Sequence, residues 1–160
     1  MANLILDEWL WSDLSGENGQ ERQRESFRFI KAIYIRCDRI VTVKNSPFET
    51  KAKRFLGRSD ATSRPIVKFC SRAILFNSDK FHCILEQELC PVPNTALVGI
   101  KPDDSYLVEA YYVDTTTTIV STDEPLIDKL KSNGVNCEHR DEFVTRYLAT
   151  VSKLFENGSS

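Results

Sequence analysis

The chain has 160 residues, of which 41% are hydrophobic and 28% charged, and its formal net charge is −2. This length and hydrophobic fraction predict one domain with a substantial core over residues 1–156, with 157–160 as a disordered tail. The near-neutral charge excludes a uniformly basic protein, so a nucleic-acid site would require an uneven distribution of charge.

Strands and helices are expected to alternate along the first half of the chain. A short apolar run at 4–6 is typical of a buried strand, and a turn-rich break follows at 15–20. Apolar spacing predicts a helix over 21–37, in which Phe27, Ile30 and Tyr34, widened by Phe29 and Ile33, form the buried stripe. Further elements are expected as a strand over 39–43, a helix over 46–57 with Ser46 as its N-cap and Pro47 at its first position, and a helix from about Pro65 to 76.

The second half continues the alternation after a stretch at 80–100 that is harder to interpret. The sequence predicts a strand within 81–87, a helix over 102–113, a strand over 117–122, a helix over 124–134, a strand over 135–139 and a helix over 141–155. This order predicts an α/β fold, a three-layer α/β/α sandwich with a mainly parallel central sheet.

The cysteines and the hydropathy pattern limit where the protein is expected to act. The five cysteines are odd in number and no pair has the CxxC spacing, which argues against a disulfide framework or a zinc site. Buried reduced thiols in a cytoplasmic protein are expected instead. No segment reaches the roughly 18 apolar residues that span a membrane, and the first residues lack the basic region of a signal peptide.

Four acids stand near the expected ends of strands or starts of helices: Asp7, Glu49, Asp104 and Asp123. In open parallel sheets, ligand sites lie beyond the carboxyl ends of the strands. Carboxylates gathered there repel one another unless a cation lies among them, and carboxylate oxygens suit Mg²⁺ or Mn²⁺. Taken singly, Asp7 can be a turn residue after a strand and Glu49 a first-turn helix residue, and Asp104 and Asp123 can each be an N-cap.

At these acids the sequence resembles a PIN domain, a metal-dependent ribonuclease fold. The likeness lies in "LILDEWL", "IVTVKNSPFE" and "DDSYLVEAYYVDTTTTIVSTDEPLIDKL". It implies that Asp7, Glu49, Asp104 and Asp123 are the catalytic and metal-binding residues, with Asp103 as an alternative to Asp104. The family's small hydroxyl or amide residue after the first acid is missing from "DEWL", which leaves the support of Asp7 unassigned.

Basic residues are concentrated between positions 44 and 72. This segment contains eight basic residues and two acids, so its local net charge is +6. Lys44, Lys51, Arg54 and Arg58 are the candidate contacts to a nucleic-acid backbone. The alternative is that these residues are only the solvated faces of two helices.

Two functions therefore remain open. The first is a metal-dependent endoribonuclease that hydrolyses phosphodiester bonds of RNA, or of DNA, with carboxylate-bound Mg²⁺ or Mn²⁺. The second is a catalytically inactive PIN-like module that binds nucleic acid or docks a partner. The resemblance also leaves room for an antitoxin or another protein partner and for a homodimer. A receiver-like or phosphate-transfer domain is less favoured, because no Gly-rich phosphate loop is present.

Overall fold

The computed structural model describes residues 1–157, in which five strands form one sheet in the order β3-β2-β1-β4-β5. Every neighbouring pair in this sheet is parallel, which confirms the predicted α/β class. The strands are β1 (Asn3–Leu6), β2 (Arg39–Val43), β3 (Phe81–Ile84), β4 (Thr118–Ser121) and β5 (Cys137–His139).

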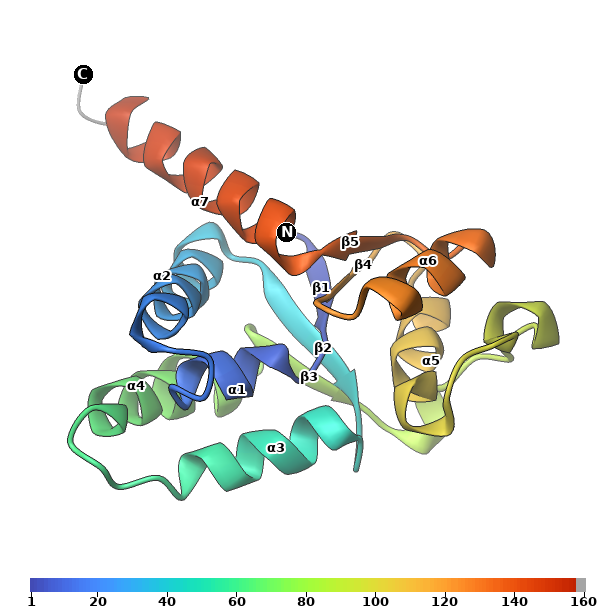
Figure 1. Ribbon diagram of the computed structural model, residues 1–160, viewed down its shortest axis with the longest axis horizontal. Helices are drawn as coiled ribbons and strands as arrows, with labels where there is room; N and C mark the ends of the chain where they lie inside the picture. The colour runs from blue at the N-terminus through green and yellow to red at the C-terminus, as the bar shows by residue number, and fades with distance from the viewer. Residues whose placement is uncertain (158–160) are drawn as a thin grey trace.

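Helices cover both faces of the sheet and complete a three-layer sandwich (Figure 1). They are α1 (Trp9–Leu14), α2 (Gln20–Arg36), α3 (Pro47–Leu56), α4 (Ser63–Phe69), α5 (Ser105–Val113), α6 (Glu124–Ser132) and α7 (Arg140–Asn157). A π-helical turn spans Cys70–Leu75, and 3₁₀ turns span Glu86–Glu88, Asn94–Leu97 and Pro102–Asp104. Helices α1 to α4 and α7 lie on one face, and α5 and α6 on the other.

The sequence explains the central strands and the start of α3. Leu4, Ile5 and Leu6 of β1 are all buried, because a central parallel strand is covered on both faces. The side chain of Ser46 accepts a hydrogen bond from the backbone N–H of Glu49 at 3.3 Å, and Pro47 is the first helical residue. The predicted N-cap of this helix is therefore confirmed.

Three local predictions differ from the structure. The sequence does not predict helix α1, because Trp9, Leu10, Trp11 and Leu14 are all buried within six residues and show no helical periodicity. In α2 the buried face is centred on Phe29, Ile30 and Ile33, whereas the side chain of Tyr34 is 46% exposed. Helix α4 begins at Ser63, since a proline is tolerated within the first turn.

The remaining expectations concern the thiols, the membrane and the tail. All five cysteines are free, but only Cys70 and Cys137 are buried, whereas Cys37 and Cys90 are exposed. None of the helices within residues 1–157 is long and apolar enough to cross a membrane. Helix α7 reaches Asn157, the first residue of the predicted tail, and residues 158–160 lie outside the described part of the chain.

Candidate functional site

An open cleft of about 570 Å³ lies at the carboxyl edge of the sheet, beyond the ends of β1 and β4. These strands are neighbours, but the helices that follow them leave to opposite faces. Such a reversal is the place where open α/β sheets bind their ligands. The lining consists of Asp7, Glu8, Trp9, Ser12, Asp13, Asn18, Arg22, Lys51, Asp104, Thr122 and Asp123.

Asp7 enters the cleft directly from β1. Its backbone N–H donates to the carbonyl of Val120 at 3.1 Å, which extends the ladder between β1 and β4 by one residue. Its carboxylate accepts hydrogen bonds from the Ser121 hydroxyl at 2.8 Å and from the Glu8 N–H at 2.7 Å. The Tyr106 hydroxyl approaches the same carboxylate at 3.5 Å. The orientation of Asp7 is thus set by groups from β4 and α5.

Ser121 connects two of the predicted acids. Its hydroxyl donates to Asp7 and accepts from the backbone N–H of Asp123 at 3.1 Å. Asp123 is also the N-cap of α6, because its carboxylate accepts from the Leu126 N–H at 3.1 Å. Capping and cleft lining are therefore compatible roles for Asp123. Ser121 provides the support for Asp7 that the residues following Asp7 do not supply.

Asp104 reaches the cleft from the turn before α5, whereas Asp103 is not part of the lining. Burial raises the pKa of Asp104, and the negative charges of Asp7 and Asp123 raise it further, against an opposing effect of Lys101. No other residue between 1 and 157 donates a hydrogen bond to its side chain. Asp104 is thus a carboxylate that its surroundings destabilise in the charged form.

Glu8 is a further acid of the cleft that the sequence analysis did not select. Its pKa is raised, mainly by burial and further by the negative charges of Asp7 and Asp104, whereas the positive charge of Lys51 lowers it. Asp13 also lines the cleft, but Arg140 lies 3.2 Å from it and is almost fully buried. Sequence could have indicated Glu8 only through its position beside Asp7, because its approach to Asp104 depends on the tertiary fold.

Glu49 does not join the other acids. Its carboxylate is buried outside the cleft, 3.0 Å from Lys44 and 2.9 Å from Lys53, and accepts from the Asn45 N–H at 2.8 Å. Burial favours a higher pKa, but hydrogen bonds from Lys53, Lys44 and Asn45 outweigh it and lower the pKa to about 2. Ser46 and Glu49 have capping-box spacing, which turns the carboxylate back toward the chain before α3. The expectation that Glu49 shares the site of Asp7 is therefore corrected.

The predicted basic contacts divide between two places. Lys51 lines the acidic cleft, and with Arg54 and Arg58 it also lines a smaller pocket of about 90 Å³ next to it. Lys44 belongs instead to the ion pairs of Glu49. Arg22 is a cleft cation that the sequence did not indicate, and it forms an ion pair with Asp141.

The charges that remain without compensation in the cleft are mostly negative. Asp13 is paired with Arg140 and Arg22 with Asp141. The other charged lining residues are four acids (Asp7, Glu8, Asp104 and Asp123) and one cation, Lys51. Within residues 1–157, no group of three or more His, Cys, Asp or Glu side chains is arranged to hold a metal ion. The cleft is therefore an acidic, open site without a closed cage of ligands.

Comparison with protein-family models, curated proteins and solved structures finds no match. The fold and the site thus define a class in structural terms: an all-parallel, five-stranded α/β sandwich with a carboxylate-lined cleft at the β1–β4 switch point.

Proposed function

We propose that the protein is a metal-dependent nuclease, an endoribonuclease of the PIN-like type. One observation carries the proposal: Asp7, Asp104 and Asp123 come from three separate elements and line one open cleft at the β1–β4 switch point. The raised pKa of Asp104, caused by burial and then by Asp7 and Asp123, indicates that this arrangement costs free energy in the absence of positive charge.

The cofactor in this proposal is Mg²⁺ or Mn²⁺. Mg²⁺ is usually bound by one or two carboxylates and completes its shell with water and substrate oxygens, so the absence of a three-ligand group among residues 1–157 is compatible with such a hydrated ion. Among Asp7, Asp104 and Asp123, one or two would hold it directly and the others through bound water, and Glu8, not Glu49, is a fourth acid that lines this cleft. When bound, such an ion lowers the pKa of a water molecule and shares the negative charge of the phosphate.

The protein's own side chains would orient the site and the substrate. The hydroxyls of Ser121 and Tyr106 hold the carboxylate of Asp7 in one orientation. The ammonium group of Lys51 donates to Ser12 at 2.8 Å at the border of the cleft, where it can attract a phosphodiester toward acids that would otherwise repel it.

The direct test is cleavage of a fluorescently labelled single-stranded RNA with Mn²⁺ or Mg²⁺. We expect cleavage that EDTA stops and that Asp123→Asn abolishes. Asparagine is as good an N-cap as aspartate, so α6 should be unaffected. Glu124→Gln is the matched control, because Glu124 is adjacent and exposed but does not line the cleft. Intact RNA with both metals over a range of pH would reject the proposal.

A second candidate is a catalytically inactive module that binds nucleic acid or a protein partner. It is favoured by the position of Glu49, which is engaged by two lysines instead of lining the cleft. This candidate predicts RNA binding in EDTA that Lys51→Gln weakens and Asp123→Asn does not, together with no cleavage. Measuring binding and cleavage on the same variants separates the two functions.

A further inference from the structure

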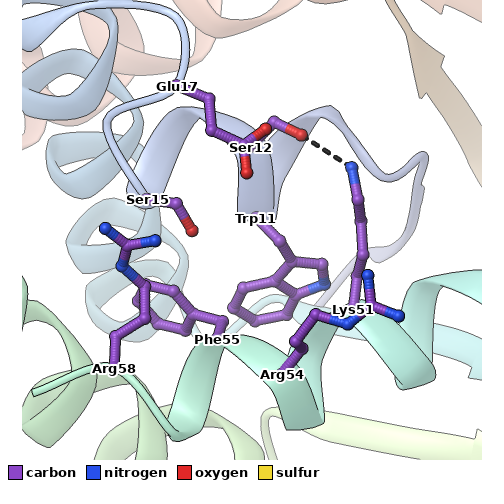
Figure 2. Close-up of a pocket in the computed structure, with 8 residues that line it drawn as sticks. All are labelled: Trp11, Ser12, Ser15, Glu17, Lys51, Arg54, Phe55 and Arg58. Atoms are coloured by element: carbon purple, nitrogen blue, oxygen red, sulfur yellow. Dashed lines mark hydrogen bonds between the residues drawn. The ribbon is translucent and has the colours of Figure 1, made fainter.

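A second pocket adjoins the acidic cleft and has the opposite charge. It lies between α1 and α3, measures about 90 Å³, and is lined by Trp11, Ser12, Ser15, Glu17, Lys51, Arg54, Phe55 and Arg58. Figure 2 shows these side chains arranged around a common hollow, with the indole of Trp11 and the ring of Phe55 below it. Ser12 and Lys51 line this pocket and the acidic cleft alike.

The cations of this pocket are only partly neutralised. The side chain of Arg54 forms no hydrogen bond or ion pair with any residue between 1 and 157, and Lys51 donates to a neutral partner, the Ser12 hydroxyl. Arg58 forms an ion pair with Asp60 at 3.4 Å and donates a hydrogen bond to the Ser63 hydroxyl at 3.3 Å. The single acid of the lining, Glu17, is exposed. Three cations therefore face one carboxylate, which favours an anion as the ligand.

Polar groups without partners line the same pocket. Trp11 is 2% exposed, and its indole N–H has no hydrogen-bond partner among the described residues. In Figure 2 that nitrogen lies on the side of the ring nearest Lys51 and Arg54. The hydroxyl of Ser15 likewise makes no hydrogen bond within residues 1–157. A buried donor without a partner calls for an acceptor that the protein itself does not supply.

We propose that this pocket binds one phosphate group of a nucleic-acid strand whose neighbouring part occupies the acidic cleft. The inference rests on the proposed function and adds to it a defined subsite. A guanidinium group donates two parallel hydrogen bonds to a pair of phosphate oxygens. Hydroxyl groups can donate to the phosphate oxygens that remain. Because Lys51 and Ser12 border both sites, a strand that leaves the cleft passes directly into the pocket. The phosphate belongs either to the backbone or to a strand end.

The test measures binding of a short single-stranded RNA by fluorescence anisotropy in EDTA, so that cleavage plays no part. We expect Arg54→Gln to weaken binding about 10-fold and to reduce the dependence of log K on log salt by about one ion. Arg24→Gln is the matched control, since Arg24 is an exposed arginine of α2 that is not part of the pocket. Its effect should stay within about 2-fold.

A gain-of-affinity variant guards against misfolding as an explanation. Glu17→Gln removes the one negative charge of the pocket and should strengthen binding about 3-fold. Comparing RNA with a 5′-phosphate and with a 5′-hydroxyl identifies the source of the phosphate. A preference for the phosphorylated end that Arg54→Gln removes indicates a terminal phosphate, and equal loss on both RNAs indicates a backbone phosphate.

The subsite and the nuclease can fail independently. If Arg54→Gln and Glu17→Gln both bind like the wild type, the phosphate pocket is rejected, whether or not the protein cleaves RNA. If those variants change binding as expected but no metal supports cleavage, the subsite stands and the nuclease proposal falls.

Discussion

Asp104 and Glu49 are both carboxylates at the start of a helix, yet their surroundings are opposite. Glu49 receives hydrogen bonds from two lysines and a backbone N–H, and its pKa falls to about 2. Asp104 has no such donor within residues 1–157, and burial and neighbouring acids raise its pKa. A carboxylate that accepts hydrogen bonds from neighbouring cations and N–H groups stabilises the fold. A carboxylate surrounded by other negative charges is available to bind a cation from solution.

The strongest test of this contrast is the loss of activity expected when Asp104 is neutralised. Asp104→Asn should reduce the rate of Mn²⁺-dependent RNA cleavage at least ~100-fold, because it removes a proposed metal ligand. Single-turnover kinetics would measure the effect. Asp103→Asn, a neighbouring acid outside the lining, should stay within about 3-fold. If the two variants behave alike, the assignment of Asp104 is wrong.

Glu49 should show the reverse pattern, a loss of stability without a loss of activity. Glu49→Gln leaves Lys44 and Lys53 without their buried partner and should lower the free energy of unfolding by about 2 kcal/mol, a moderate value because both lysines are exposed to solvent. Urea denaturation measures the change. The folded fraction of the variant should cleave RNA at the wild-type rate, and a defect in the folded enzyme would restore Glu49 to the site.

The difference in stability between the wild type and Glu49→Gln should also depend on pH. The folded pKa of Glu49, about 2, lies below its ordinary value of 4.5. A depressed pKa contributes stability that is complete above the unfolded value and is lost as pH falls toward the folded value. The stability difference between wild type and Glu49→Gln should therefore be constant near pH 7 and shrink from about pH 4.5 downward. A difference that grows in acid would contradict the ion-pair assignment.

A smaller effect is expected at the hydroxyl that links Asp7 to Asp123. Ser121→Ala removes the hydrogen bond to Asp7 and should weaken Mn²⁺ binding about 10-fold, the lower end of the effect of groups that orient metal ligands. Quenching of tryptophan fluorescence by Mn²⁺ is a suitable measurement, because Trp9 lines the cleft. Unchanged Mn²⁺ affinity would show that Ser121 does not position Asp7 for a metal.

The smallest effect is on the stability of Asp104→Asn. Removing one of several like charges should raise the free energy of unfolding by about 0.5 kcal/mol at pH 7. Because the folded pKa of Asp104 is raised, this gain should disappear as pH falls below the ordinary value of 3.8, where the carboxyl group is protonated in both states. Destabilisation at pH 7 would mean that Asp104 has a partner in solution.

The sequence predicts the fold well where local signals are strong. β2 coincides with its β-branched run, and α3 begins at the predicted Ser46 cap. The sequence does not predict helix α1, because five of its six residues are buried and the apolar ones show no helical spacing. Asp7 and Asp123 could be placed at one sheet edge because both follow strands, and parallel strands end on the same side.

The sequence predicts where a residue lies along the fold better than it predicts which way its side chain points. Glu49 was placed with the other acids, although its capping-box spacing from Ser46 already indicated a turn back toward Asn45. Glu8 and Ser121 were missed because their importance depends on contacts with Asp104 and Asp7, which are 96 and 114 residues away along the chain. Such contacts follow from packing and not from any local pattern.

One wall of the cleft depends on Arg140, which lies 127 residues after its partner Asp13. Arg140, the first residue of α7, is almost fully buried and bonds to Asp13 of α1 and to Ser26 and Glu25 of α2. Without α7, Asp13 would be a buried charge lacking its cation. During synthesis, therefore, the part of the wall around Asp13 cannot take up its final arrangement before Arg140 has left the ribosome.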